Sequence, residues 1–339
     1  MNQSFVMSTG HWQVEGTIER DPNTAKNGLG QTTLNIISTI MGGGIVSIPY
    51  AYAVAGPEIG FMVQGLVVVA ILIACMLYLR TRSILQCGTS FTQLANMCLG
   101  RYSSIFINGL IALAVFGILT LYLLLFAKIA IQIVTATYIE AEDSRSILAG
   151  KTVYIVALCV LISPITLRKR LQELKLTTYV LVFGVVCLTV LLSAKLCLEG
   201  SYQYRVEQGI TQPLEPDGAT EHERSLGERT LDSINIAVAS QGFVIALFPI
   251  YGDMQKAARP RMMVSILSAL TFTCACYTYL SFVSMSYFGK RNIQQSIFEN
   301  MKASDDTGTR LLLFLFLIIF CCNIPFLFFA GKVSIIAIC

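Results

Sequence analysis

Long runs of apolar residues, separated by short polar stretches, fill the chain from residue 31 onward. An α-helix needs about 20 predominantly apolar residues to cross the hydrocarbon core of a bilayer, and most of the runs approach or exceed that length. The pattern therefore predicts an all-α integral membrane protein whose transmembrane domain covers 31–339. We expect eight spans, at about 32–56, 60–79, 104–138, 152–167, 177–198, 231–254, 262–288 and 311–337.

Basic residues are concentrated in the short polar stretches that follow the second and fourth runs. Arg80 and Arg82 follow the second run, and the basic residues at 168–170 follow the fourth. Short cytoplasmic loops carry an excess of Lys and Arg, so we expect these loops and the polar tail at 1–30 to be cytoplasmic. The long polar loop at 199–230 is then expected on the outer side.

A shorter helical pattern lies between the second and third runs. Phe91, Leu94, Met97 and Cys98 recur there at helical spacing within a largely polar stretch. This spacing predicts a short amphipathic helix on the membrane surface.

The first span, Gln31–Gly56, is apolar but is interrupted by three consecutive glycines and a proline. Each glycine costs about 1 kcal/mol of helix stability relative to alanine, so the glycines favour a discontinuous helix. If the helix opens there, the N–H groups of Gly43, Gly44 and Ile45 and the carbonyls at 38–41 lose their intrahelical partners. Such groups are tolerated in a bilayer only where they line a protein cavity or meet a ligand.

The freed backbone groups suit the two charges of an amino acid zwitterion. The half-helix that begins near Gly44 would direct its positive end toward a carboxylate, and the freed carbonyls suit an ammonium group or a small cation. The alternative is that the glycines only allow close helix packing. We favour the discontinuity because packing motifs place small residues a turn apart, whereas these glycines are adjacent.

Composition excludes several classes of function. The sequence is 55% hydrophobic and 13% charged, with a mean hydropathy of +0.67, which excludes an ordinary soluble enzyme. The net charge of +4 is too diffuse to indicate nucleic acid as a partner. No catalytic constellation and no metal-ligand spacing among the eleven cysteines stand out. We therefore predict no enzyme activity and no cofactor, apart from sodium or a proton as coupling ion.

Four patches of the sequence resemble one known family in the right order. They are NIISTIMGGGIVSIPYA in the first span, the connector SPITLRKRLQELKLTTY, the segment FPIYGDMQKAARPRM, and NIPFLFFAGK in the eighth span. Together they resemble the amino acid/auxin permeases, and within them the sodium-coupled neutral amino acid transporter branch. The resemblance covers most of the range from Gln31 to Lys332.

This resemblance implies a leucine-transporter-type inverted-repeat fold in which the first and sixth spans are broken at mid-membrane. The eight spans counted here would lack the last spans of that fold. Interrupted spans at corresponding positions of two repeats are the usual pointer to a transporter's binding site. The implied substrate-binding residues are Gly42, Gly43, Gly44 and Ile45 for the carboxylate, and Ser240, Gln241 and Gly242 for the amino group.

The resemblance also implies a possible sodium site. It would use oxygens of the first span at Ser38 and Met41 together with the side chain of Asn323, since sodium prefers hard oxygen ligands. Asn323 has an equal alternative as an interhelical hydrogen-bonding residue. The sequence departs from the sodium-coupled branch at Ser38, where that branch has asparagine, and at 243–246, where that branch has C-H-P-E.

Lys128 is the basic residue that stands out inside a predicted span. A charge within the bilayer costs a few kcal/mol and by default indicates function, here replacement of a cation or a gating pair. The equally weighted alternative is that its ammonium group extends to the outer surface.

The leading hypothesis is a secondary active transporter of neutral amino acids that works by alternating access and is coupled to sodium or protons. Neutral substrates are favoured because neither interrupted span carries an acid or base to pair with a charged side chain. The alternative is a non-transporting amino acid sensor or scaffold that signals through its N-terminal tail. The expected partners are the amino acid and the lipid bilayer, in the plasma membrane or in a vacuolar or lysosomal membrane.

Overall fold

The computed structural model describes residues 27–85, 91–138, 150–166, 174–208, 225–301 and 306–336. The regular elements within these ranges are helices, which confirms the predicted all-α class. Most of the predicted tail, residues 1–26, lies outside the described residues.

Each predicted span corresponds to a helix or to a closely connected pair. These are α1 (Leu29–Ala55), α2 (Pro57–Leu85), α4 (Arg101–Tyr138), α5 (Lys151–Thr166), α6 (Leu174–Glu199), the pair α9 (Leu226–Ser240) and α10 (Leu247–Asp253), α11 (Met262–Phe288) and α13 (Thr307–Ile336). The predicted amphipathic segment is helix α3 (Phe91–Leu99). The short helices α7 (Tyr202–Glu207) and α12 (Ile297–Met301) lie in polar connections and were not predicted.

Among the described residues, six helical segments are long and apolar enough to cross a membrane, and the bent helix α1 is a seventh. Helix α5 has 16 residues, fewer than a bilayer crossing usually needs. The fourth predicted span is therefore present as an apolar helix, but it is the shortest of the set.

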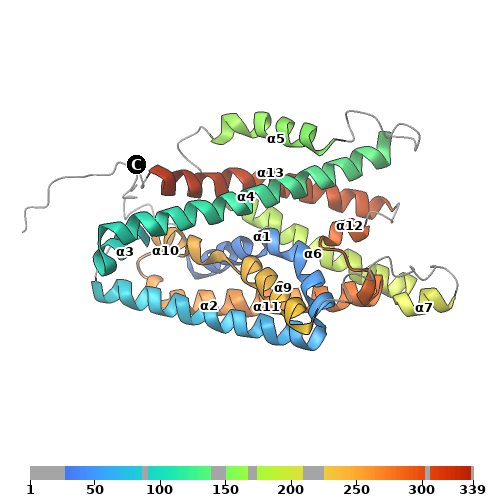
Figure 1. Ribbon diagram of the computed structural model, residues 1–339, viewed down its shortest axis with the longest axis horizontal. Coiled ribbons are helices and arrows are strands. Elements are labelled where there is room, and N and C mark those ends of the chain that lie inside the picture. The colour runs from blue at the N-terminus through green and yellow to red at the C-terminus, as the bar shows by residue number, and fades with distance from the viewer. Residues whose placement is uncertain are drawn as a thin grey trace, which may run out of the picture.

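The helices form two groups around α1 (Figure 1). In one group α4 and α13 pack along each other, with α5 outside them. In the other, α2, α9 and α11 pack around α1, and α6 contacts both α1 and α13. Helix α1 therefore lies at the centre, and its isoleucines Ile36, Ile40, Ile45 and Ile48 belong to the main buried core.

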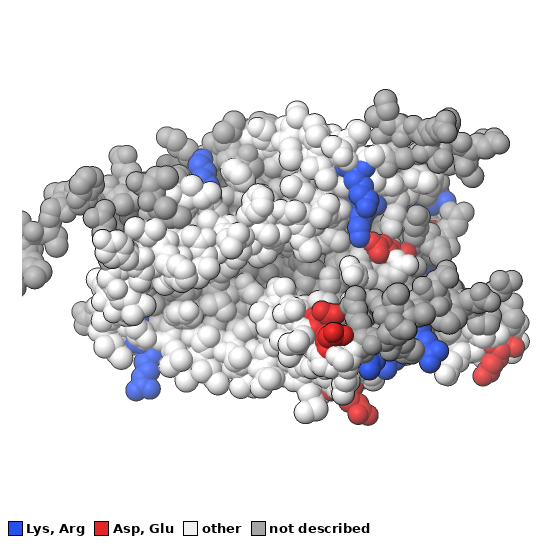
Figure 2. Space-filling model, viewed as in Figure 1, with Lys and Arg blue, Asp and Glu red and all other residues white. Residues whose placement is uncertain are grey.

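The outer surface of the bundle is apolar, as a bilayer requires. Large side chains such as Met62, Leu66, Phe106 and Phe116 are more than half exposed. On the face shown in Figure 2, the described acidic side chains lie only in the half that carries α7 and α12. The middle of that face is formed mainly by uncharged residues.

Backbone pairing ties the start of α1 to the end of α10. The N–H of Asn27 donates to the carbonyl of Asp253 at 3.3 Å, and the N–H of Gln255 donates to the carbonyl of Asn27 at 3.1 Å. Met254, between them, is completely buried. The first span thus begins directly beside the point where the sixth span ends.

Candidate functional site

Helix α1 changes direction sharply at its glycines. The segments Leu29–Gly42 and Gly44–Ala55 are inclined to each other by 58°. The backbone nevertheless remains helical from Leu29 to Ala55. The helix is therefore bent at the predicted position, but it does not open there, because the backbone stays helical through the glycines.

The sixth span is interrupted more fully. Helix α9 ends at Ser240, Gln241 and Gly242 leave the helical path, and a 3₁₀ turn over Phe243–Ala246 leads into α10. The N–H of Phe243 donates to the carbonyl of Gln241 at 2.8 Å, two residues back. The predicted break in the sixth span is thus confirmed at Gln241 and Gly242.

The two interruptions lie against each other. A Cβ atom built on Gly44 would lie 2.3 Å from Cβ of Ser240 and 2.6 Å from its Cα. Real Cβ atoms do not approach other atoms so closely, so this contact requires glycine at position 44. The bend of α1 and the C-terminus of α9 are therefore in direct backbone contact.

A tyrosine of α11 joins the same crossing. The hydroxyl of Tyr277 donates to the carbonyl of Ile40 at 2.9 Å and lies 3.5 Å from the carbonyl oxygen of Ser240. Tyr277 is completely buried. Sequence reasoning missed this residue, although a tyrosine inside an apolar span needs a partner for its hydroxyl.

Gly42 faces the other helix group. A Cβ atom at Gly42 would lie 2.2 Å from the hydroxyl oxygen of Tyr122 on α4 and 3.9 Å from the amide nitrogen of Asn323 on α13. Tyr122 is buried, and its ring packs edge-on against Phe320 of α13 with centroids 5.3 Å apart. Sequence reasoning missed Tyr122 as well.

Residues 25–330 match the profile of the family described as "Transmembrane amino acid transporter protein". The chain belongs to this family. The match includes both interrupted spans, Tyr122 and Tyr277, and confirms the resemblance at the level of the family. The protein is thus an amino acid transporter of the membrane by family, with the crossing of α1 and α9 at its centre.

The transporter buries two glutamine amides without partners, one of them in the break of the sixth span. Gln241, in the break, and Gln64, on α2, are both 0% exposed. Neither amide nitrogen nor amide oxygen of either side chain has a hydrogen-bond partner among the described residues. Gly242, in contrast, is exposed at the surface of the break. Of the predicted substrate residues, Gly44 and Ser240 are thus in contact, and Gln241 is buried directly after Ser240.

The predicted sodium ligands of the transporter have different surroundings. Ser38 donates to the hydroxyl oxygen of Thr178 on α6 at 3.3 Å and lies 3.4 Å from the carbonyl oxygen of Asn35. Met41 is almost completely buried in the core. Asn323 approaches the first span at Gly42, one turn beyond Ser38. The sodium site therefore stays a prediction.

Lys128 has a specific partner. Its ammonium group forms an ion pair with Glu299 of α12, and the amide of the nearby Gln132 donates to the carbonyl of Phe298 at 3.3 Å. Helix α12 is thereby attached to α4. A second lysine, Lys195 on α6, is more buried than Lys128 and was overlooked: it donates to Thr309 at 2.8 Å and lies 3.3 Å from Asp306.

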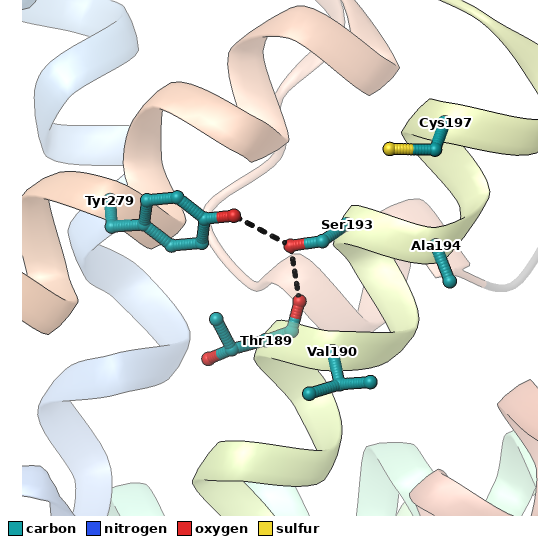
Figure 3. A pocket seen from close by; sticks show the side chains of 6 residues that line it. All are labelled: Thr189, Val190, Ser193, Ala194, Cys197 and Tyr279. Atoms are coloured by element: carbon teal, nitrogen blue, oxygen red, sulfur yellow. Dashed lines mark hydrogen bonds between the residues drawn. The ribbon is translucent and has the colours of Figure 1, made fainter.

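Two grooves of the transporter lie away from the crossing, on either side of Tyr279. One, of about 380 Å³, lies between α6 and α11, and there the Ser193 hydroxyl donates to the Thr189 carbonyl and lies 3.0 Å from the Tyr279 hydroxyl (Figure 3). The other, of about 570 Å³, lies between α2 and α11. Neither groove is lined by a predicted site residue. At the predicted site itself, Gly44 lies directly against Ser240.

Proposed function

We propose that the protein is a secondary active transporter of neutral amino acids that works by alternating access. The observation that carries this proposal is the contact of Gly44 with Ser240, where two interrupted spans cross in a member of an amino acid transporter family. Inverted-repeat transporters bind their substrates at such interruptions, where helix ends supply unpaired backbone groups.

The two charges of the substrate would meet different helix ends. We propose that the bend of α1 opens further when substrate binds, so that the carboxylate accepts hydrogen bonds from N–H groups of Gly43, Gly44 and Ile45 at the positive end of the segment Gly44–Ala55. The hydroxyl of Tyr122, next to Gly42, is placed to donate to the same carboxylate.

The ammonium group would meet the negative end of α9, where the backbone carbonyls of Ser240, Gln241 and Gly242 leave the helix. The amide of Gln241 would gain in the substrate the partner that it now lacks. Neutral side chains fit, because the segments 31–56 and 233–252 contain no charged residue.

Alternating access follows from the tightness of the crossing. No substrate fits between Gly44 and Ser240 while their backbones touch, so α1 and α9 have to separate when substrate enters. We propose that α1, α2, α9 and α11 move as one group against α4, α5 and α13, as the packing in Figure 1 suggests. The N-terminus would be cytoplasmic, because Arg82 and Arg259 both lie over the ring of Tyr251, at the end of α10 beside which α1 begins, and cytoplasmic ends of spans carry an excess of Lys and Arg.

Uptake of radiolabelled neutral amino acids into proteoliposomes tests this proposal. We expect uptake that depends on an imposed sodium or proton gradient and that is lost when the gradient is collapsed. The matched control is Gly117→Ala on α4, where an added Cβ meets no atom within 4 Å, and this variant should transport like the wild type. Absence of gradient-dependent uptake by a folded protein that binds amino acids would overturn the proposal.

One observation favours a second candidate, an amino acid sensor. The backbone pairing of Asn27 with Asp253 and Gln255 couples the N-terminal segment to the inner end of the interrupted sixth span. A ligand that moved α10 would therefore also move the residues that precede Asn27. Amino acid binding without flux, together with ligand-dependent protection of the N-terminal segment from proteolysis, would favour this function.

A further inference from the structure

The carbonyls of Ile40 and Ser240 converge on one point, the hydroxyl of Tyr277. In a regular α-helix the carbonyl of Ile40 pairs with the N–H of Gly44, which here lies just beyond the bend. Ser240 is the last residue of α9, where carbonyls lack intrahelical partners. The carbonyl of Ile40 therefore lies in the last turn of the segment Leu29–Gly42, before the bend, and the carbonyl of Ser240 lies at the C-terminus of α9.

Helix C-termini carry a partial negative charge, equivalent to roughly half an electron each. Two such ends meet at Tyr277, inside the buried core. Spans α1 and α11 contain no charged residue, and neither does the segment 233–252 around the break. Two carbonyl oxygens that approach each other need a positive charge between them. Within these spans, the hydroxyl proton of Tyr277 is what supplies it.

A tyrosine hydroxyl donates a single hydrogen bond. It cannot serve both carbonyls at once, and the distances of 2.9 and 3.5 Å show that it favours Ile40. The hydroxyl of Ser240 does not help, because it donates to the carbonyl of Ala237 at 3.0 Å. Two converging carbonyls and one proton are an incomplete version of a monovalent cation site, in which oxygens surround a full positive charge.

We infer that the hydroxyl of Tyr277 occupies the place of a monovalent cation between the first and sixth spans. The contact between the carbonyls of Ile40 and Ser240 therefore needs no bound ion, because the hydroxyl proton of Tyr277 joins them. The inference rests on the proposed function in one respect: the cation whose place Tyr277 takes is treated as a coupling ion of the transporter. The place of this cation differs from the predicted sodium site in its oxygens: that site uses Ser38, Met41 and Asn323, whereas Tyr277 bridges the carbonyls of Ile40 and Ser240.

The test is a gain of cation dependence in Tyr277→Phe. Thermal unfolding of the full chain is measured in sodium, potassium or choline chloride at equal ionic strength, up to about 0.15 M. In choline we expect the variant to unfold several degrees below the wild type. Added sodium or potassium should then raise its midpoint as a bound ligand does, progressively with concentration.

The matched control is Tyr52→Phe. Tyr52 is also a buried tyrosine, two turns beyond Gly44 in α1, but its hydroxyl bonds to the side chain of Thr278 at 3.1 Å and not to a helix-end carbonyl. It should lose stability without gaining any response to cations beyond that of the wild type. An equal cation response in Tyr277→Phe and wild type would overturn the inference.

Tyr277→Lys decides the matter if Tyr277→Phe does not fold in any salt. Its ammonium group reaches about as far as the tyrosine hydroxyl and supplies the cation covalently. We expect this variant to fold with a midpoint near that of the wild type in all three salts, although a lysine at mid-membrane is ordinarily strongly unfavourable. Failure of both variants to fold would overturn the inference. The measurements need no transport, so failure of the proposed function would leave them unaffected.

Discussion

The two interrupted spans differ in a way that their sequences do not suggest. Helix α1 carries three consecutive glycines, yet its backbone stays helical and only bends, by 58°. The sixth span has one glycine at its break, Gly242, yet the helix stops and restarts through a 3₁₀ turn. The number of glycines therefore does not set how far a helix opens.

The difference follows from where the freed backbone groups find partners. In α1 the carbonyl before the bend receives the hydroxyl of Tyr277, so the helix can bend without unwinding further. In the sixth span the N–H groups of Gln241, Gly242 and Phe243 turn back to carbonyls only two to four residues away. The bend is thus stabilised from another helix, whereas the N–H groups of the break find their partners locally.

The glycines of α1 also serve packing, which was the alternative to a discontinuous helix. Gly44 admits the backbone of Ser240, and Gly42 admits the hydroxyl of Tyr122. The packing alternative is thus supported by these contacts, whereas the predicted opening of the helix is present only as a bend.

The largest expected effect is that of Gly44→Ala. The added methyl group would meet Cα and Cβ of Ser240 at 2.6 and 2.3 Å, and backbone cannot yield as a side chain does. Overpacking of this kind costs about 3 kcal/mol of folding stability, and we expect transport by the remaining folded protein to be largely lost, because the two spans can no longer approach each other. Uptake rates in proteoliposomes and thermal unfolding measure the two consequences.

Gly42→Ala separates the two glycines. Its methyl group would meet only the hydroxyl end of Tyr122, so we expect a smaller loss than in Gly44→Ala, and partial recovery of stability in Gly42→Ala combined with Tyr122→Phe. Equal losses of stability and transport in Gly42→Ala and Gly44→Ala would contradict this. They would show that α1 needs glycine for its bend and not for its contact with the sixth span.

The next effect concerns the unpartnered amide in the break. Gln241→Met replaces a buried amide without partners by an apolar group of similar size, which should leave the free energy of unfolding unchanged or raise it by about 1 kcal/mol. Transport should nevertheless fall by about 30-fold if the amide meets the substrate. Gln64→Met is the control, with the same gain in stability and little change in transport. A clear loss of stability in Gln241→Met would instead show that the amide has a partner.

A smaller effect is expected at two predicted sodium ligands, Ser38 on α1 and Asn323 on α13. Ser38→Ala and Asn323→Ala should each weaken activation of uptake by sodium by about tenfold, which is the loss of roughly one ligand, 1.4 kcal/mol, while the apparent affinity for the amino acid changes little. The control is Thr33→Ala, whose hydroxyl donates to a carbonyl of its own helix at 3.1 Å. Unchanged sodium activation in both variants would remove these residues from the ion site.

The architecture could be predicted from the sequence to a large extent, because the thickness of the bilayer fixes how long an apolar run must be to cross it. Glycines and prolines marked both interruptions, since these residues disturb helices wherever they occur. Tyr122 and Tyr277 could not be predicted as site residues, because their roles depend on which helices pack against α1. The same limit applies to Ser38, which has a partner on α6 that no local pattern indicates. The local sequence determines where a helix is interrupted, whereas the tertiary packing determines which groups bond to the backbone there.

The smallest effect tests how the two spans begin. Helix α9 starts with a capping box, in which the hydroxyl of Ser225 accepts from the N–H of Glu228 and the carboxylate of Glu228 accepts from the N–H of Ser225. Helix α1 starts at Gly28 without a side-chain cap. Ser225→Ala should therefore lower stability by about 1 kcal/mol, whereas Gly28→Ala should change it by a few tenths. Because the cap lies at the far end of α9 from the break, the loss should appear in thermal unfolding and leave the uptake rate within about twofold of the wild type. A larger loss of uptake would mean that a change at the outer end of α9 alters the position of Ser240. Helix α9 would then move as a rigid body during transport.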